Sequence, residues 1–298
     1  NDVGGGFGQK MMVTRDEAAV MLAGYKLGDR PVKWIEDRRE NLIAANQARE
    51  EWIDVTMAVT AEGDIMACRV NFLEDVGAYP AASGSTAAMA AGMFPGPYKM
   101  PVVLPEGTAY FSNTCGKHAY RGPWMMETVA REQMIDHVAY ELGIDPIAMR
   151  RRNIIRQSDL PYTTCTTMVY DVVTPEETLD QALEMLNLDE ARKMQAKARE
   201  EGRLVGIGVA TYIEPSAIAF GILSSDQANV RIDENGKVIV ALSSGSHGHS
   251  IETTMPQVIA EHLGCDIDDV IIYQGDTSSA PVGPGTGGSR TAVVVGGA

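Results

Sequence analysis

Cysteine is scarce in this sequence and never occurs in a local pair. The 298 residues contain four cysteines, which lie far apart at Cys68, Cys115, Cys165 and Cys265. Without a C-x-x-C pair, the chain offers no local ligand set for zinc or for an iron–sulfur cluster, and nothing indicates a disulfide framework. This usage favours an intracellular, cytoplasmic protein.

Positive charge and long apolar runs are also in short supply. Lys and Arg number 25 against 40 Asp and Glu, so the net charge is −15. Nucleic acids and anionic membrane surfaces bind through Lys and Arg, so neither is an expected partner, whereas a small-molecule ligand is compatible. The most apolar stretch, residues 87–104, is interrupted by glycine, proline and lysine, and a membrane-spanning helix is not expected.

Signatures of several enzyme classes are missing as well. The sequence has no G-x-S-x-G nucleophile motif, which leaves a hydrolase without support. Gly283 and Gly288 have the spacing of a phosphate loop, but Ser289 stands where that loop requires lysine, so an NTPase of this type is excluded. His247 and His249 match no known zinc spacing such as H-E-x-x-H, and no side-chain metal site is expected.

The pattern of apolar residues predicts an α+β fold with two tandem units, residues 1–200 and 201–298. A β-hairpin followed by a helix is expected in both units, with the hairpins at 52–73 and 228–242 and the helices at 126–142 and 250–263. Thr14 and Glu17 form a capping box before a helix that stops at Gly28. Asp145 caps a short basic helix, and residues 205–213 and 270–273 predict strands. Residues 74–124, rich in Gly, Pro, Ala and Ser, predict a long functional loop.

Both ends of the chain suggest a piece of a longer polypeptide. The sequence begins at Asn1 on a glycine-rich motif, without an initiator Met or a signal segment, and it stops in an apolar run at Ala298. We therefore expect the first unit to lack an N-terminal part and the second to be incomplete. A short domain with irregular ends is the alternative.

Three short motifs supply candidate site residues. Consecutive glycines at residues 4–8 allow backbone N–H groups to approach an anion or oxo group, although a tight turn is the commoner use of such a run. The loop at residues 283–290 is rich in Gly, Ser and Thr beside an arginine and could hold a phosphate through its backbone N–H and hydroxyl donors, and a flexible loop is the alternative. Arg121 precedes a helix and could stabilise developing negative charge, or it could form an ordinary ion pair.

Taken in order, seven motifs across the whole chain resemble the molybdopterin-binding large subunit of the xanthine oxidase family. The nearest branch is that of aldehyde oxidases and aerobic carbon monoxide dehydrogenases. The motifs are DVGGGFGQK at 2–10, RPVKWIEDRRE at 30–40, AYRG at 119–122, RRRN at 150–153, ETT at 252–254, QGDT at 274–277 and GTGGSR at 285–290. An ordered set of this kind is far more specific than any single member of it.

The resemblance implies a molybdenum hydroxylase that acts on an aldehyde or an N-heterocycle. In that family, a molybdopterin cofactor, often its cytosine dinucleotide in bacteria, holds Mo through a dithiolene, so no side chain need ligate the metal. A Glu deprotonates the Mo hydroxide, which attacks a C–H carbon while hydride moves to the sulfido ligand. Electrons leave through [2Fe-2S] clusters to FAD, usually on an iron-sulfur subunit and an FAD subunit, in a dimer of heterotrimers. The cofactor carries the difficult chemistry.

Carried over by motif, the resemblance assigns roles to residues of this chain. Arg121 would stabilise charge on the substrate and is the one catalytic residue expected within the chain. The substrate pocket would include Met11, Pro123 and Trp124. The cofactor would be bound by Gly5, Gly6, Phe7, Gly8, Arg121, Gly248, His249, Thr286, Gly287, Gly288 and Ser289.

Several departures from the family pattern narrow this expectation. Where the family commonly has Gly-Gln-Gly, this chain has Gly248, His249 and Ser250, so a hydrogen-bond donor is kept but its reach changes. Met11 replaces the Glu of purine-oxidising members, and Pro123 replaces their aromatic residue. The Cys-Ser-Phe-Arg loop of the CO-oxidising members is absent. Neither purine nor CO is the expected substrate.

The Gly-x-Gly-Glu motif with the family's catalytic Glu is absent from this chain. The chain alone is therefore not expected to turn over. One alternative hypothesis is a paralogue with an altered cofactor, which His249 and Ser250 suggest. The other is a non-catalytic or split-subunit piece that forms part of the cofactor wall for a partner chain.

Overall fold

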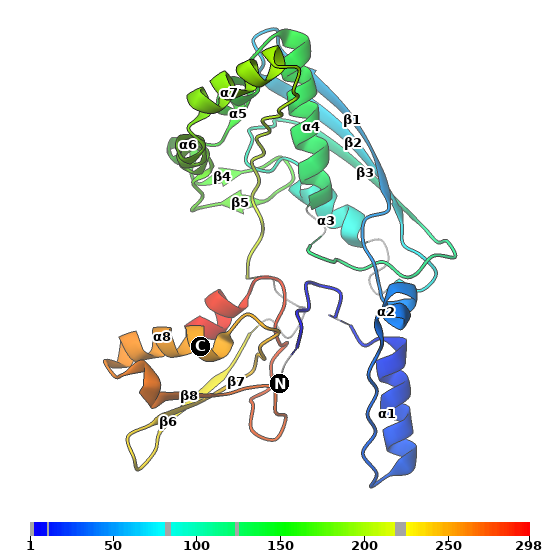
Figure 1. The fold of residues 1–298 in the computed structure, drawn as a ribbon, viewed down its shortest axis with the longest axis vertical. Helices are drawn as coiled ribbons and strands as arrows, with labels where there is room; N and C mark the ends of the chain where they lie inside the picture. The colour runs from blue at the N-terminus through cyan, green and yellow to red at the C-terminus, as the bar shows by residue number, and fades with distance from the viewer. Residues whose placement is uncertain (1–2, 11, 81–84, 123–124, 218–224) are drawn as a thin grey trace. The chain divides into compact units, whose positions relative to one another are not determined.

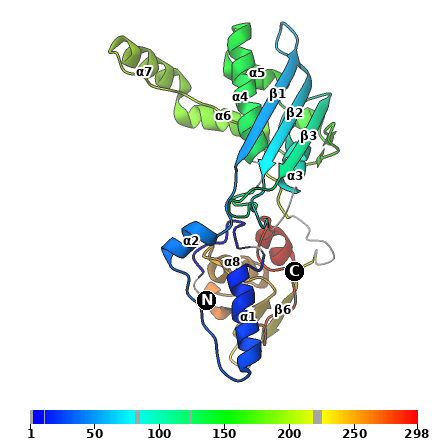
Figure 2. The ribbon, with the colours of Figure 1, turned by 90° about the vertical axis from the view of Figure 1, so that its right-hand side faces the viewer.

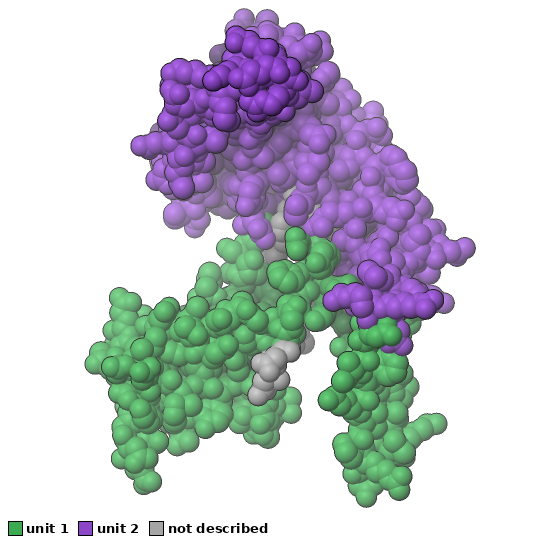
Figure 3. All heavy atoms as spheres, in the orientation of Figure 1, with its two compact units in different colours: residues 1–37, 120–122, 215–298 green, residues 38–119, 123–214 purple. Residues whose placement is uncertain are grey.

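The computed structural model describes residues 3–10, 12–80, 85–122, 125–217 and 225–298. The chain divides into two compact units that are not contiguous in sequence (Figure 3). Unit 1 comprises residues 1–37, 120–122 and 215–298, and unit 2 comprises residues 38–119 and 123–214. The domain boundary expected near residue 200 stays a prediction.

Unit 2 is built on a three-stranded sheet in the order β1-β2-β3 (Figures 1 and 2). β1 (Glu51–Val59) and β2 (Ile65–Asp75) form the predicted antiparallel hairpin, and β3 (Val103–Tyr110) runs parallel to β2. The strand β3 lies inside the segment that was expected to be a loop. It was not predicted because Pro105 and Gly107 interrupt the strand pattern of its sequence. Proline is tolerated there since β3 is an edge strand.

Helices cover one face of this sheet. The predicted α4 (Met125–Leu142) and the unpredicted, alanine-rich α3 (Ser85–Met93) pack with the hairpin around a core that includes Val70, Phe72 and Phe94. α5 (Pro146–Asn153) begins as predicted, with the Asp145 carboxylate accepting the N–H groups of Ile147 and Ala148. The remaining elements of unit 2 are α2 (Arg38–Ala44), η1 (Gln157–Asp159), β4 (Tyr162–Thr163), β5 (Val169–Tyr170), α6 (Pro175–Leu186) and α7 (Leu188–Glu200).

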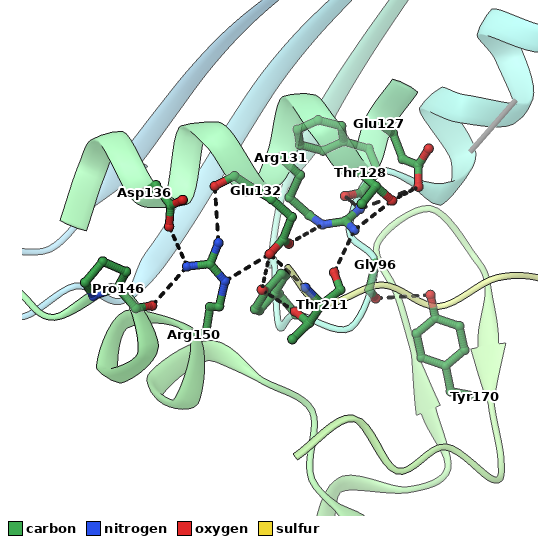
Figure 4. Close-up of polar contacts among 12 residues, drawn as sticks. Gly96, Glu127, Thr128, Arg131, Glu132, Asp136, Pro146, Arg150, Tyr170 and Thr211 are labelled. Atoms are coloured by element: carbon green, nitrogen blue, oxygen red, sulfur yellow. Dashed lines mark hydrogen bonds and ion pairs between the residues drawn. The ribbon is translucent and has the colours of Figure 1, made fainter. Parts of the chain in front are cut away.

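A buried network of charged groups connects α4 and α5 (Figure 4). Arg131 and Arg150 are fully buried, and Glu132 bonds to both, at 3.2 Å from Arg131 Nε and 2.9 Å from Arg150 Nε. Arg150 also donates to Asp136 at 2.6 Å, and Tyr98 donates to Glu132 at 3.1 Å. Each buried charge therefore has an opposite charge within hydrogen-bond reach, as burial requires.

The strand predicted over residues 205–213 is wrong, because no ladder forms there within the described part of the chain. Exposure still alternates along the segment, so the backbone is extended, but side chains satisfy its polar groups. Glu132 Oε2 accepts the Thr211 N–H at 3.0 Å, and Arg131 donates to the Thr211 carbonyl at 3.2 Å. Gln195 donates to the Val205 carbonyl at 2.9 Å. The buried network thus holds a segment that periodicity alone assigns to a sheet.

One carboxyl of unit 2 should make stability depend on pH. Glu127 is buried, and burial raises its pKa from 4.5 to about 7 although Arg131, 3.8 Å away, lowers it. Between these values the folded state binds a proton that the unfolded state has lost, so stability falls as pH rises from about 4.5 to about 7. In the parent, the urea-unfolding free energy should fall between about pH 5 and pH 8, and Glu127→Gln should reduce this fall by on the order of 1–3 kcal/mol. An unchanged slope would contradict this assignment.

Unit 1 repeats the sheet topology of unit 2. β6 (Ala228–Ile232) and β7 (Val238–Leu242) form the predicted hairpin, and β8 (Val270–Tyr273) adds parallel to β7. α8 (Ile251–Leu263) covers one face and ends at Gly264, where φ is 70°. The predicted succession of hairpin and helix is therefore confirmed in both units. The other elements are α1 (Arg15–Leu27), η2 (Ile267–Asp269) and a π-helical turn η3 (Thr291–Val295).

The helix α1 begins as predicted, since the Thr14 N–H donates to the Glu17 carboxylate at 2.9 Å. No helix in the described part of the chain is both long enough and apolar enough to cross a bilayer.

Candidate functional site

The glycine-rich turn at residues 4–8 lies against the loop at residues 245–250, and both belong to unit 1. The Gly5 N–H donates to the His247 carbonyl at 2.7 Å. A Cβ on Gly6 would stand 2.8 Å from His247 Nδ1, and one on Gly248 would stand 3.1 Å from the Val3 carbonyl oxygen. The two segments can approach this closely because glycine occupies the contact points.

The turn presents backbone donors. The Gln9 N–H donates to the Gly6 carbonyl at 2.9 Å and closes the turn, with Gly5, Phe7 and Gly8 all at positive φ. Among the described residues, the N–H groups of Phe7 and Gly8 have no hydrogen-bond partner. Consecutive N–H groups of this kind form an anion-binding nest.

Arg121 joins this turn from a distant part of the sequence. Its N–H donates to the Phe7 carbonyl at 2.5 Å, and its guanidinium lies over the Phe7 ring. The structure therefore brings together two of the motifs that the sequence singled out, although they are more than a hundred residues apart.

Left-handed backbone at non-glycine residues gathers in these loops. Phe7, Arg121, Ser250 and Ser289 have φ values of 51°, 58°, 58° and 52°. Each such residue costs on the order of 1–3 kcal/mol and persists only where its surroundings fix it. Strain of this kind is common in binding and catalytic loops.

The departure at residues 249–250 has a structural explanation. Ser250 is the N-cap of α8 and takes the left-handed conformation that glycine adopts most easily. The Ser250 carbonyl accepts the N–H groups of Thr253 and Thr254, which holds this conformation in place. His249 Nδ1 accepts the His247 N–H at 3.2 Å, so Nε2 is the donor left for a ligand.

Burial and neighbouring groups favour the neutral form of the adjacent His247. Partial burial lowers the pKa of His247, and His249 and Lys10 lower it further. For Glu252 the charged form is favoured, because hydrogen bonds from its own backbone N–H and from Gln274 lower its pKa. Within the described residues, no three His, Cys, Asp or Glu side chains are arranged to hold a metal ion.

The loop at residues 283–290 is tied to the same region of unit 1. The Thr286 hydroxyl donates to the Gly245 carbonyl at 2.5 Å, so its oxygen is left as an acceptor for any ligand. The adjacent arginine of this loop points to a protein carboxylate. Arg290 is fully buried, and both its Nε and Nη2 lie 2.8 Å from Asp226 Oδ2.

Sequence reasoning missed three polar residues of the site. Gln274 bridges the loops, since Oε1 accepts the Ser246 N–H at 2.9 Å and Nε2 donates to Glu252 at 3.2 Å. Ser244 Oγ is buried without a partner among the described residues. Asp226 holds Arg290. The QGDT motif at 274–277 could have identified Gln274. No motif or spacing in the sequence identifies Ser244 or Asp226. The predicted pocket residues Met11, Pro123 and Trp124 lie outside the described residues.

This fold and these loops place the chain in a known class. Residues 1–154 and residues 181–298 each match a family model described as a molybdopterin cofactor-binding domain. The chain belongs to this family, within the molybdenum hydroxylases. The resemblance seen in the sequence motifs is therefore confirmed.

Particular relatives cover almost the whole chain. It is 34% identical to the nicotine 6-hydroxylase large subunit of Paenarthrobacter nicotinovorans, over 99% of this chain and 38% of that protein. It is 34% identical to the carbon monoxide dehydrogenase large chain of Hydrogenophaga pseudoflava, over 100% of this chain and 39% of the relative. The crystal structure of quinoline 2-oxidoreductase from Pseudomonas putida 86 superposes with a TM-score of 0.92 at 36% identity, over 99% of this chain and 39% of that one. The chain thus spans about two fifths of its relatives' length.

The residues present fit a molybdopterin cofactor. Such a cofactor holds its metal through its own sulfur atoms and needs donors for oxo, pterin and phosphate groups. Counting only partners among the described residues, the site offers the unpartnered amides of Phe7 and Gly8, the Nε2 donor of His249 and the buried, unpartnered hydroxyl of Ser244. Backbone amide, imidazole and hydroxyl donors are the kinds of group that could bind the oxo, pterin and phosphate parts of this cofactor.

Proposed function

We propose that this chain is the cofactor-binding core of a molybdenum hydroxylase that oxidises an aldehyde or an N-heterocycle. The observation that carries the proposal is the meeting of the turn at 4–8, Arg121 and the loop at 245–250 within one unit of a molybdopterin-binding chain. When bound, the cofactor would supply molybdenum with oxo, sulfido and hydroxo ligands for oxidation of a C–H carbon. The protein would supply position and electrostatics.

Each segment of the site has a distinct part in the proposal. The Phe7 and Gly8 amides, with His249, would bind the metal-bearing end of the cofactor, and the small size of Gly5, Gly6 and Gly248 would let the backbone approach it. Residues 286–289 would bind the pterin or its phosphates. Arg121 would stabilise negative charge that develops on the substrate. Met11, Pro123 and Trp124 remain the predicted substrate pocket.

An N-heterocycle is the substrate class with the most support. Two relatives carry nicotine and quinoline in their names, and both compounds are N-heterocycles. The residues at 121–124 are Arg-Gly-Pro-Trp rather than the Cys-Ser-Phe-Arg loop of CO-oxidising members, so CO is not proposed. Met11 replaces the Glu of purine-oxidising members, so purines are not proposed either.

The proposal extends to the assembly. Electrons would pass through [2Fe-2S] clusters on an iron-sulfur subunit to FAD on a third subunit, in a cytoplasmic dimer of heterotrimers. The pterin would carry the cytosine dinucleotide. Names such as "large subunit" and "large chain" among the relatives support a multi-subunit enzyme.

The test is a molybdenum and pterin analysis of the complete subunit, co-expressed with the products of its neighbouring genes. The matched variants are Gly6→Ala and Gly4→Ala. A Cβ on Gly6 would press on His247, whereas a Cβ on Gly4 would meet nothing within 4 Å. We expect stoichiometric Mo and pterin fluorescence in the parent and in Gly4→Ala, and a lower Mo content in Gly6→Ala.

A folded, assembled complex without Mo would overturn the proposal. That result would favour the non-catalytic or split-subunit alternative, with His249 and Ser250 marking a lost cofactor site. Equal Mo content in both glycine variants would remove the turn at residues 4–8 from the cofactor site.

A further inference from the structure

The guanidinium of Arg121 lies against two neighbouring aromatic rings. Its Cζ lies 5.5 Å from the centroid of the Phe7 ring and 5.4 Å from the centroid of the Tyr120 ring. Both distances fall within the range of about 6 Å in which a cation is attracted to the face of a ring. All three residues belong to unit 1.

The two rings also support each other. Their centroids are 6.5 Å apart and their planes meet at 68°, which is the edge-to-face arrangement that aromatic pairs prefer. The Phe7 carbonyl accepts the Arg121 N–H, so Phe7 contacts both the backbone and the side chain of Arg121. The left-handed φ of 58° at Arg121 is consistent with a residue whose position its surroundings determine.

The way Arg121 is held leaves its charge available. Among the described residues, no carboxylate forms an ion pair with Arg121, although the chain carries 40 Asp and Glu residues. A carboxylate would neutralise the guanidinium and occupy its N–H donors. An aromatic face orients the group while its N–H donors, which lie at the edge of the guanidinium plane, stay available for an anion.

We propose that Tyr120 and Phe7 are positioning residues that orient Arg121 toward the substrate without neutralising it. This inference deepens the proposed function and rests on the role given there to Arg121. Tyr120 acts on Arg121 through its ring, so phenylalanine, which keeps the ring, should replace it in this role and leucine should not.

The first test measures the accessibility of Arg121 and needs no catalysis. Phenylglyoxal modifies guanidinium groups, and peptide mass spectrometry reports the rate at each arginine of the complete, assembled subunit. Arg69, an exposed residue of unit 2 paired with Glu106 at 3.0 Å, is the internal reference. Tyr120→Leu should raise the rate at Arg121 relative to Arg69 by about two- to fivefold, the factor that one exposed cation–π contact corresponds to. Tyr120→Phe should leave the ratio close to that of the parent.

The second test separates positioning from folding and from cofactor loading. In the Mo-containing enzyme, Tyr120→Leu should lower kcat at unchanged Mo content, and Tyr120→Phe should restore it. Unchanged labelling of Arg121 in Tyr120→Leu, or failure of Tyr120→Phe to restore the parent ratio, would overturn the inference. Because the labelling ratio does not depend on Mo, an enzyme without Mo would defeat the proposed function while the labelling still decided the role of Tyr120.

Discussion

Replacing Arg121 by alanine in the complete enzyme is expected to lower kcat by a factor of about 10²–10³ while Mo content stays constant. Loss of one preorganised charge-stabilising donor typically has an effect of this size. The guanidinium lies beside the turn proposed to face the cofactor, and the two rings that it contacts leave its N–H donors available. Steady-state kinetics on an N-heterocycle, with Mo measured on the same preparation, gives the answer.

Two further variants separate charge from backbone in this experiment. Arg121 has φ 58°, a conformation that strains alanine but suits glycine, so Arg121→Gly removes the same charge without backbone strain. Equal losses in the two variants would assign the effect to the side chain. Arg231→Ala, which removes an exposed charge of β6 in the same unit, should retain kcat. Parent-like activity of Arg121→Gly would contradict the proposed role.

The parts of the fold that the sequence predicts are those that local signals encode. The two hairpins have alternating apolar residues with Gly63 or Gly236 in the turn, and both glycines have positive φ. The start of α5 depends on Asp145, whose carboxylate accepts two N–H groups of the first turn. Such signals are complete within about ten residues of sequence.

The parts that were not predicted depend on distant partners. β3 contains Pro105 and Gly107, and pairing with β2 compensates for its weak strand propensity. The segment around Thr211 is extended, but Glu132 and Arg131 take the hydrogen bonds that a neighbouring strand would have taken. Periodicity reports which side chains are buried and does not report what satisfies the backbone.

The site shows the same division. Glycine runs predict that the backbone can closely approach a neighbouring segment, and in the structure Gly6 and Gly248 make such contacts. Sequence spacing did not predict whether an individual arginine would be exposed or buried in an ion pair. Arg121 and Arg290 both lie in loops, yet Arg121 is exposed beside two aromatic rings, whereas Arg290 is fully buried against a carboxylate.

The buried partner of Arg290 should therefore have a large effect on stability. Asp226→Asn is expected to lower the unfolding free energy of the subunit by about 3–5 kcal/mol, because removing one member of a buried ion pair is strongly destabilising. The side chains of Asp226 and Arg290 are both 0% exposed, and arginine does not lose its charge in proteins. Asp226 Oδ1 also accepts the Ser243 hydroxyl at 2.8 Å, so the substitution disturbs a second contact.

An exposed pair of the same unit provides the control. Lys237 and Asp269 lie 2.7 Å apart with side chains about two-fifths exposed, and Lys237→Met should cost less than about 1 kcal/mol. The double variant Asp226→Leu with Arg290→Met should recover much of the loss, since apolar replacement of a whole buried pair is often close to neutral. Urea unfolding of all three variants measures these differences. If Asp226→Asn cost no more than Lys237→Met, the buried pair would not be what anchors the end of the loop at residues 283–290.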